Sequence, residues 1–397
     1  MKSWPSIRVD RDAGVTAPAG FRAAGVAAGI KASGGPDLAL VVNDGPEFTA
    51  AGVFTTNLVK AAPVLWSQEV LRHRRLRAVV LNSGGANAAT GPGGFQDTHA
   101  TAEKVAECLD TGAIEVAVCS TGLIGERLPM TAVLSGVDSA MKELDTTATA
   151  GLAAAGAVLT TDTHAKQAVA RGDGWSIGGF AKGAGMLAPN MATMLAVLTT
   201  DAALTGEVLD TALRAATRVS FDRLDVDGGT STNDTVLLLS SGTSGITPDE
   251  GEFTEALTAV SLDLVHQLRA DAEGVTKEID IVVRGAATER DAIAVGRTVA
   301  EDNLVKTALF GSDPNWGRIA MAVGRSGARV DPETLAIRVN GVTLCSGGSA
   351  AADRSAADLS GREVEIGIDL GLGDAEATIL STDLSHGYVE ENSAYSS

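Results

Sequence analysis

The chain has 397 residues, of which 45% are hydrophobic and 20% charged, and its formal net charge is −19. This length and composition predict a folded protein of two to three packed units rather than a disordered chain. Because an acidic surface repels phosphate backbones and anionic lipids, neither nucleic acid nor a membrane is expected as a partner.

Hydrophobic periodicity predicts strands and helices in a mixed order along the chain. Some predicted strands follow one another with no helix between them, which favours stacked α+β layers over regular βαβ winding. The glycine- and proline-rich stretch Gly91–Gly94 is expected to be a loop. In chain order the predicted strands are Leu38–Val42, Ala78–Leu81, Ile114–Cys119, Thr235–Leu239, Ile279–Val283, Ile319–Val323, Leu335–Val339 and Val364–Ile368, and the predicted helices are Gln96–Leu109, Glu207–Ala216, Phe253–Ala272 and Glu289–Ala300.

Neither a disulfide framework nor a metal site is indicated. The three cysteines, Cys108, Cys119 and Cys345, are widely spaced and odd in number, and no CxxC or Cys/His ligand spacing occurs. The first residues lack the apolar run of a signal peptide, and no stretch approaches the ~20 apolar residues that span a membrane. A cytoplasmic protein is therefore expected.

One segment near the middle of the chain, Lys182 to Leu195, combines glycine and proline with an apolar run. On its residues alone it predicts a loop that leads into a buried strand, where a threonine such as Thr193 is common. Its Gly-x-Gly element lacks the third glycine of a dinucleotide-binding loop and the Lys-Ser/Thr ending of a phosphate-binding loop. The segment by itself therefore predicts no particular chemistry.

The same segment resembles the cleavage-site motif of the ornithine acetyltransferase family, the bifunctional glutamate N-acetyltransferases of arginine biosynthesis. The resemblance extends in one order over nearly the whole chain, with departures at Gly85, Ala89, Ala165 and Gly229, where the family pattern has Asn, Cys, Pro and Asp. The matching blocks are Gly14–Phe21, Gly52–Asn57, Asn82–Gly91, Ser120–Gly125, Thr160–Thr163, Thr230–Thr235, Asp271–Gly274, Asp313–Arg318 and Tyr388–Ser397.

The resemblance implies self-cleavage between Ala192 and Thr193, giving an α chain of residues 1–192 and a β chain of residues 193–397. A threonine hydroxyl needs an adjacent base, and an N-terminal threonine supplies its own α-amine, whose ordinary pKa is about 7.7–8.0. The implied reaction moves the acetyl group of N2-acetylornithine to glutamate through an acetyl-Thr193 intermediate.

The resemblance also implies the other site residues. Thr121 and Gly122 match the family's oxyanion-hole pair, and the substrate contacts match Thr160, Lys182, Thr193, Glu273, Asn392 and Ser397, with Thr161 an alternative to Thr160. On the residues alone, four of these have a plainer interpretation. Thr121 and Gly122 fit a turn after a strand, Lys182 a solvated loop lysine, and Glu273 a helix-end carboxylate.

The implied fold is an α/β (α+β) sandwich of stacked β-sheets flanked by helices, of the self-cleaving N-terminal-nucleophile type, with a smaller C-terminal lobe. The implied assembly is a heterotetramer of two α and two β chains. No cofactor or metal is expected, and acetyl-CoA is a candidate co-substrate. The alternative enzyme class is a self-processed amidohydrolase or aminopeptidase that uses the same Thr193. A third class, a non-enzymatic binding protein, predicts one intact chain.

Overall fold

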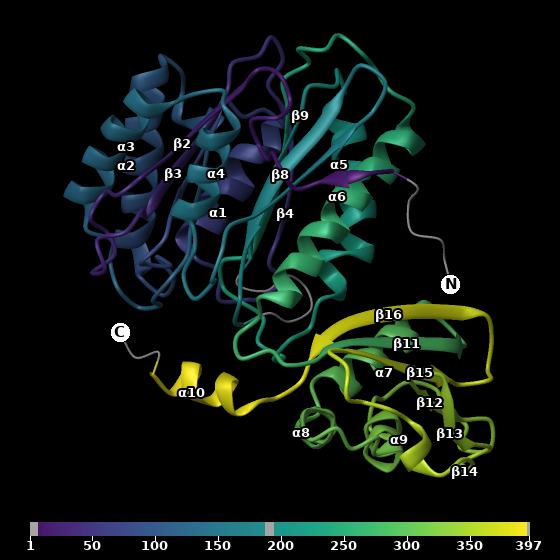
Figure 1. The fold of residues 1–397 in the computed structure, drawn as a ribbon. Coiled ribbons are helices and arrows are strands. Elements are labelled where there is room, and N and C mark those ends of the chain that lie inside the picture. Colours follow the sequence, from purple (N-terminus) through teal and green to yellow (C-terminus); the bar gives the residue numbers. More distant parts are fainter. Residues whose placement is uncertain (1–6, 187–193, 395–397) are drawn as a thin grey trace. The chain divides into compact units, whose positions relative to one another are not determined.

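The computed structural model describes residues 7–186 and 194–394, and the described chain forms two compact units (Figure 1). The first unit comprises residues 7–184, 194–222 and 230–268 of the described chain. The second comprises residues 185–186, 223–229 and 269–394. The chain passes between the units more than once, so neither unit is a single continuous segment.

Two β-sheets form the centre of the described part of the first unit. The six-stranded sheet has the order β1-β7-β8-β9-β10-β4 and the four-stranded sheet the order β2-β3-β5-β6. Neighbouring strands are antiparallel except for the parallel pairs β9–β10 and β5–β6. The strands are β1 (Val9–Asp10), β2 (Phe21–Val26), β3 (Leu38–Asn43), β4 (Thr49–Phe54), β5 (Ala78–Asn82), β6 (Val116–Ser120), β7 (Lys166–Arg171), β8 (Ser176–Lys182), β9 (Leu195–Thr200) and β10 (Thr235–Ser240).

A shared hydrophobic core lies between the two sheets. It joins Val41 and Leu81 of the four-stranded sheet to Val197 and Leu237 of the six-stranded sheet. Every residue of β3, β5, β9 and β10 is buried. Strands that are covered on both faces need apolar residues at every position, which explains their continuous hydrophobic runs.

Helices cover the outer faces of this sandwich. Side chains of α2 (Gly91–Leu109) and α3 (Met130–Glu143) pack with Leu40, Val80 and Val118 on the outer face of the four-stranded sheet. On the other side, α5 (Gly206–Val219) packs against β4, and Figure 1 shows α5 and α6 (Glu250–Ala270) along the six-stranded sheet. At the edges, α1 (Ala62–Val70) contacts β6 and α4 (Ala148–Ala157) contacts β2. The expected sandwich of stacked sheets flanked by helices is thus confirmed.

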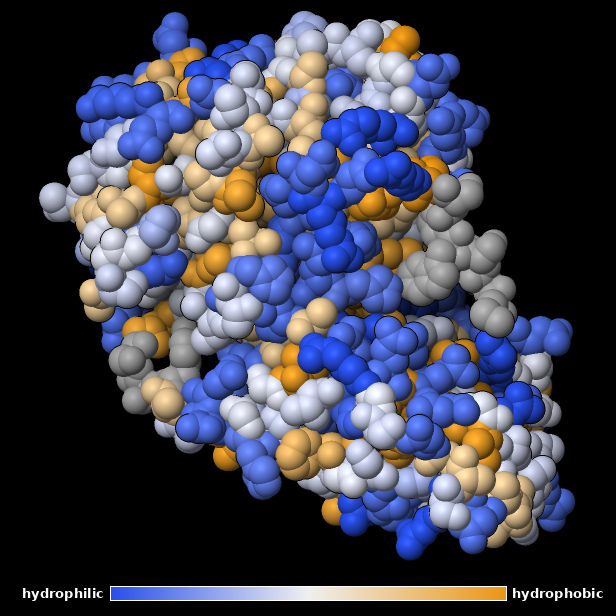
Figure 2. Space-filling model, viewed as in Figure 1, coloured by the Kyte–Doolittle hydropathy of each residue, from blue (hydrophilic) through white to orange (hydrophobic). Residues whose placement is uncertain are grey.

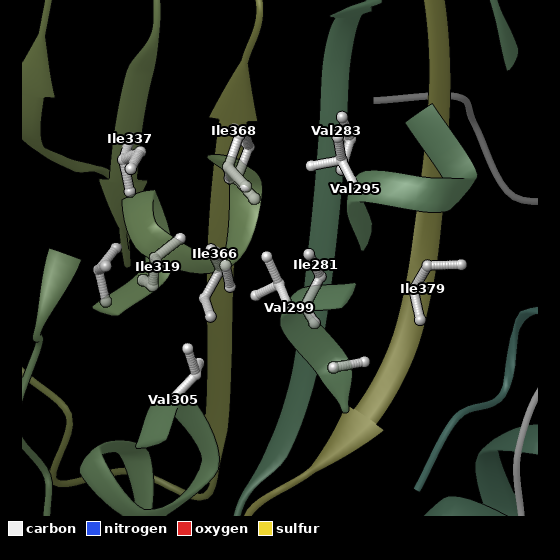
Figure 3. Close-up of a cluster of buried hydrophobic side chains, with 14 of the residues drawn as sticks. Ile281, Val283, Val295, Val299, Val305, Ile319, Ile337, Ile366, Ile368 and Ile379 are labelled. Carbon is white, nitrogen blue, oxygen red and sulfur yellow. The ribbon is translucent and has the colours of Figure 1, made fainter. Parts of the chain in front are cut away.

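The second unit is a smaller α+β lobe with its own core. Its sheet has the order β14-β13-β12-β15-β11-β16, and the helices α7, α8 and α9 cover one face of it. Figure 3 shows the isoleucine and valine side chains of this sheet and these helices meeting in one cluster. The elements of the second unit are β11 (Glu278–Ala286), α7 (Glu289–Ala300), α8 (Asn303–Phe310), α9 (Trp316–Gly324), β12 (Ala336–Val339), β13 (Val342–Ser346), β14 (Ser349–Ala350), β15 (Glu363–Asp369), β16 (Ala375–Thr382) and α10 (His386–Ala394). Over the described chain as a whole, short 3-10 turns occur at Leu71–His73, Ala113–Glu115, Phe221–Arg223 and Arg354–Ala356.

Two sequence predictions of secondary structure are wrong. The segment Ile319–Val323, predicted as a strand, lies inside α9, where Asn315 caps the helix and Ile319 and Val323 point into the core four residues apart. A five-residue apolar run is too short to distinguish the periodicity of a helix from that of a strand. The predicted loop Gly91–Gly94 is the first turn of α2, because proline is well tolerated where a helix begins.

On the face shown in Figure 2, hydrophilic and hydrophobic residues are mixed. Within residues 7–186 and 194–394, no helix is long and apolar enough to cross a membrane.

Candidate active site

The loop that follows β6 meets the end of β8 at one edge of the first unit. Lys182, the last residue of β8, pairs with Leu195 at the start of β9, and Leu195 pairs with Thr235 at the start of β10. From this edge the Lys182 ammonium reaches across to the other sheet and donates a hydrogen bond to Thr121, 3.3 Å away. Several of the sequence blocks that resemble the acetyltransferase family are therefore gathered here by the pairing of strands.

The loop after β6 is held by backbone hydrogen bonds to the glycine-rich loop after β5. The Thr121 N–H donates to the Asn82 carbonyl at 3.0 Å, and the Ala86 N–H donates to the Leu123 carbonyl at 2.9 Å. The buried Asn233 amide donates to the carbonyls of Ala86 (2.6 Å) and Ser120 (2.8 Å) and so ties both loops to the start of β10. The family resemblance includes Asn233 without a role, and the structure assigns it this structural one.

Gly122 lies at a close approach of these two loops. Its φ of +127° is rarely adopted by residues with a side chain, and a Cβ there would lie 2.6 Å from backbone atoms of Gly84 and Gly85. Within the described chain, the Gly122 N–H makes no hydrogen bond. In this conformation the chain bends at Gly122, and the Gly122 N–H has no hydrogen-bond partner among the described residues.

Lys182 is the centre of a buried polar cluster rather than a solvated loop lysine. Its side chain is only 1% exposed. Its ammonium donates to the Thr160 hydroxyl at 2.8 Å and to the Thr121 hydroxyl at 3.3 Å, and it lies 3.8 Å from the Asp162 carboxylate. Of the two adjacent threonines left open by the sequence, Thr160 is the one in contact with Lys182.

Asp162 is the buried anion that balances this cluster. Its carboxylate accepts hydrogen bonds from the Lys166 ammonium (2.7 Å) and the Gly183 N–H (2.6 Å). Burial alone would raise the pKa of Asp162, but Lys182 and Lys166, with these hydrogen bonds, lower it to about 2. Burial lowers the pKa of Lys182 from its usual value, and Asp162 opposes that effect. Asp162 is therefore a carboxylate at all physiological pH values.

A second buried carboxylate, Asp234, lies at the entry to β10. It accepts a hydrogen bond from the Met194 N–H at 3.0 Å, and Met194 directly follows Thr193 in the chain. Burial raises the pKa of Asp234 well above its usual value, while Lys182 and Ser231 oppose this rise. The family motif Thr230–Thr235 contains Asp234, but sequence reasoning assigned it no function, because burial and charge pairing are not visible in a short motif.

In the second unit the structure brings Glu273 and Asn392 together. The Asn392 side-chain amide donates to Glu273 at 2.8 Å and to the Tyr388 carbonyl at 3.0 Å, so α10 is anchored to the segment after α6. Gly185 lies so close to Glu273 that a Cβ on it would be 2.3 Å from the carboxylate. Two of the predicted substrate contacts, far apart in sequence, thus form one hydrogen-bonded pair.

Another acidic side chain of the second unit, Asp227, accepts hydrogen bonds from the N–H groups of Met186 (2.7 Å) and Gly229 (3.1 Å). Burial raises its pKa. Burial, together with Asp227 and Glu273, raises the pKa of Tyr388 to about 12. Tyr388 therefore stays a neutral phenol at physiological pH.

Three predicted site residues, Ala192, Thr193 and Ser397, lie outside the described residues. Among the residues that the structure does describe, no group of three or more His, Cys, Asp or Glu side chains could hold a metal ion. The chemistry available to the described cluster is hydrogen-bond donation: a hydroxyl at Thr121, a backbone N–H at Gly122 and the ammonium of Lys182. Such donors stabilise negative charge as it develops on an oxygen, which is the requirement of acyl transfer.

Comparison with known proteins places the chain in a family with this kind of chemistry. The sequence pattern of the ArgJ family matches residues 22–397. The chain is 60% identical over 398 residues to the arginine biosynthesis bifunctional protein ArgJ of Mycolicibacterium paratuberculosis, covering 99% of this chain and 98% of the relative. It is 60% identical over 383 residues to the protein of the same name from Streptomyces coelicolor, covering 96% and 100%. The chain belongs to the ArgJ family.

One similar solved structure is that of ornithine acetyltransferase from Mycobacterium tuberculosis in complex with ornithine. Its matched chain is 64% identical, with a TM-score of 0.46, and the match covers 46% of this chain and 98% of that chain.

Proposed function

We propose that this protein is a glutamate N-acetyltransferase of arginine biosynthesis, which moves the acetyl group of N2-acetylornithine to glutamate through an acetyl-Thr193 intermediate. Membership of the ArgJ family supports this reaction class. The observation that carries the proposal is the cluster of Thr121, Gly122, Thr160 and Lys182, in which Thr121 and Lys182 are buried. The family motifs meet there, and they supply donors suited to an acyl-transfer oxyanion.

In the proposed first half-reaction, the Thr193 hydroxyl attacks the acetyl carbonyl of N2-acetylornithine, and the Thr193 α-amine accepts the hydroxyl proton. Negative charge develops on the carbonyl oxygen, where the Thr121 hydroxyl and the Gly122 N–H stabilise it. When the resulting tetrahedral intermediate collapses, the bond between the acetyl carbonyl carbon and the ornithine nitrogen breaks. The Thr193 α-ammonium gives its proton to that ornithine nitrogen. Ornithine leaves, and an acetyl ester remains on Thr193.

In the second half-reaction, the neutral α-amine of glutamate attacks the ester carbonyl carbon, and the C–O bond to Thr193 breaks. The Thr193 α-amine transfers to the Thr193 oxygen the proton that the glutamate nitrogen loses. The same donors stabilise the second tetrahedral intermediate, and the Thr193 hydroxyl is regenerated. N-acetylglutamate is released, so the two substrates never need to occupy the site together.

The nucleophile requires a free α-amine on Thr193, and we propose that the chain generates it by cleaving its own Ala192–Thr193 bond. The products are the α chain, residues 1–192, and the β chain, residues 193–397, which stay together and pair as a heterotetramer of two α and two β chains. Cleavage and activity are then linked, because the intact chain has an amide nitrogen where the base is needed.

The remaining predicted contacts have clear chemical roles in this reaction. The Glu273 carboxylate is suited to bind the cationic side chain of ornithine. Asn392 donates a hydrogen bond to this Glu273 carboxylate and fixes its orientation. We assign substrate contacts also to Thr160, to Lys182 and to the C-terminal residue Ser397. The reaction needs no cofactor, and acetyl-CoA is a candidate second acetyl donor. We place the enzyme in the cytoplasm.

The test is an assay of N-acetylglutamate formation, with acetylornithine and acetyl-CoA supplied in separate reactions. The proposal expects acetylglutamate from acetylornithine and glutamate. It also expects one added acetyl mass on the 193–397 fragment when acetylornithine is supplied alone, and discharge of that mass by glutamate. Release of acetate with no acetylglutamate would instead identify a hydrolase that uses the same nucleophile. A chain that stays intact and transfers nothing would refute both enzyme classes.

A further inference from the structure

We propose that Asp162 is a positioning residue of the oxyanion hole, which acts by holding the Lys182 ammonium against Thr121 so that the Thr121 hydroxyl hydrogen points toward the reacting carbonyl. The proposal rests on the function proposed above for Thr121. Neither the family resemblance nor the matching motifs assign Asp162 a role.

The first step of the argument is the direction of the hydrogen bonds around Lys182. An ammonium group has three N–H donors and no acceptor, so the hydroxyl oxygens of Thr121 and Thr160 must both accept from it. A hydroxyl has one hydrogen, and the Thr121 hydrogen is therefore turned away from Lys182. A hydroxyl that accepts from a cation is also a stronger donor, because the two hydrogen bonds polarise each other.

The second step is what fixes Lys182 itself. The Asp162 carboxylate accepts from the Thr160 N–H (3.2 Å), the Gly183 N–H (2.6 Å) and the Lys166 ammonium (2.7 Å), and it lies 3.8 Å from the Lys182 ammonium. It therefore joins the loop at Thr160 to the ends of β7 and β8. The side chains of Asp162 and Lys166 are 0% exposed and that of Lys182 is 1% exposed. Little water screens these charges, so each has a large influence on the others.

The charges that face Lys182 have opposite signs. Asp162 and Asp234 stabilise the ammonium, whereas Lys166, at the start of β7, and Lys31, in the loop after β2, destabilise it. Removing Asp162 should therefore lower the pKa of Lys182 further, and removing Lys166 should raise it. When Lys182 loses its proton it can accept a hydrogen bond, and the Thr121 hydroxyl is then free to turn away from the substrate.

The experiment measures kcat/KM for acetylornithine from about pH 6 to about pH 10, where a bell-shaped profile reports the essential groups. We expect Asp162→Asn to move the basic limb to lower pH by roughly one to three units, the effect of one close opposite charge. Asp162→Glu should move the basic limb part of the way back toward its wild-type pH, because glutamate keeps the negative charge. Lys166→Met, of similar side-chain volume, should move the limb to higher pH. Purely structural damage would not move the limb in opposite directions for two neighbouring residues.

The cost of losing Asp162 should also appear in kcat. Because the oriented Thr121 hydroxyl acts in the transition state, kcat should fall in Asp162→Asn. An Asp162→Asn protein that does not fold leaves Lys166→Met as the deciding variant. If the folded variants share the basic limb of the wild type, Asp162 does not act through Lys182. If the wild-type protein itself forms no acetylglutamate, the proposed function has failed instead.

Discussion

Replacing Gly122 with alanine tests the backbone half of the proposed oxyanion hole. A Cβ at this position would lie 2.6 Å from backbone atoms of Gly84 and Gly85, distances that real Cβ atoms do not show. Reaching an ordinary contact of 3.4 Å requires a relative displacement of about 0.8 Å. Neither neighbour can yield by rotating a side chain, so the loop carrying the Gly122 N–H has to move.

The expected magnitude follows from these distances. A donor that moves by about 1 Å leaves the narrow range in which it stabilises an oxyanion, and a misplacement of this size costs about 10²-fold in rate. We therefore expect kcat for acetyl transfer to fall by about 10²–10³, the usual effect of removing one oxyanion-hole donor. The backbone strain at a φ of +127° should destabilise the fold by about 1–3 kcal/mol as well.

Gly125→Ala is the matched control in the same loop. Gly125 also has a positive φ, +94°, but a Cβ there meets no atom within 4 Å. It should therefore lose stability by a similar strain energy and keep kcat near the wild-type value. The assay compares kcat per cleaved molecule, the cleaved fraction on a denaturing gel and the thermal unfolding midpoint of both variants. Equal kcat in the two variants would show that the Gly122 N–H is not part of the oxyanion hole.

Three further predictions concern the nucleophile, the substrate contact and the buried charges. Thr193→Ala should abolish both cleavage and transfer, and Thr193→Ser should retain some of each, because serine keeps a hydroxyl; an active Thr193→Ala enzyme would exclude this nucleophile. Glu273→Gln should raise KM for acetylornithine by about 10- to 100-fold, the worth of a hydrogen bond to a charged group, with a smaller change in kcat; a Gln variant with unchanged KM would place the ornithine side chain elsewhere. Asp162, with a pKa lowered from 3.8 to about 2, should contribute stability that is present above pH 3.8 and is lost as the pH falls through about 2. Denaturant unfolding at several acidic pH values should therefore show a shallower decline in Asp162→Asn than in the wild type, and parallel declines would contradict the assigned pKa.

The hydrophobic pattern was enough to predict those helices and strands that are long enough to show their own periodicity. The helix predicted at Glu289–Ala300 is α7 with the same bounds, because its apolar residues recur over three turns and Thr288 caps its first turn. The strands predicted at Leu38–Val42 and Thr235–Leu239 each end one residue before β3 and β10 do. The same reasoning failed at Ile319–Val323, where five residues fit either period.

The sequence alone was enough to identify the family of this chain and the chemical groups that it offers, which are a threonine-glycine pair, a lysine and the matching motif blocks around them. These are properties of neighbouring residues, and a motif records them directly. The three-dimensional fold was needed to show that Lys182 is buried, that Asp162 balances its charge and that the Gly122 N–H has no partner in the described chain. Burial, charge pairing and hydrogen-bond direction arise where strands of the two sheets end side by side. The residues that form this edge are scattered in the sequence between Asn82 and Asp234. No short window of sequence contains all of them.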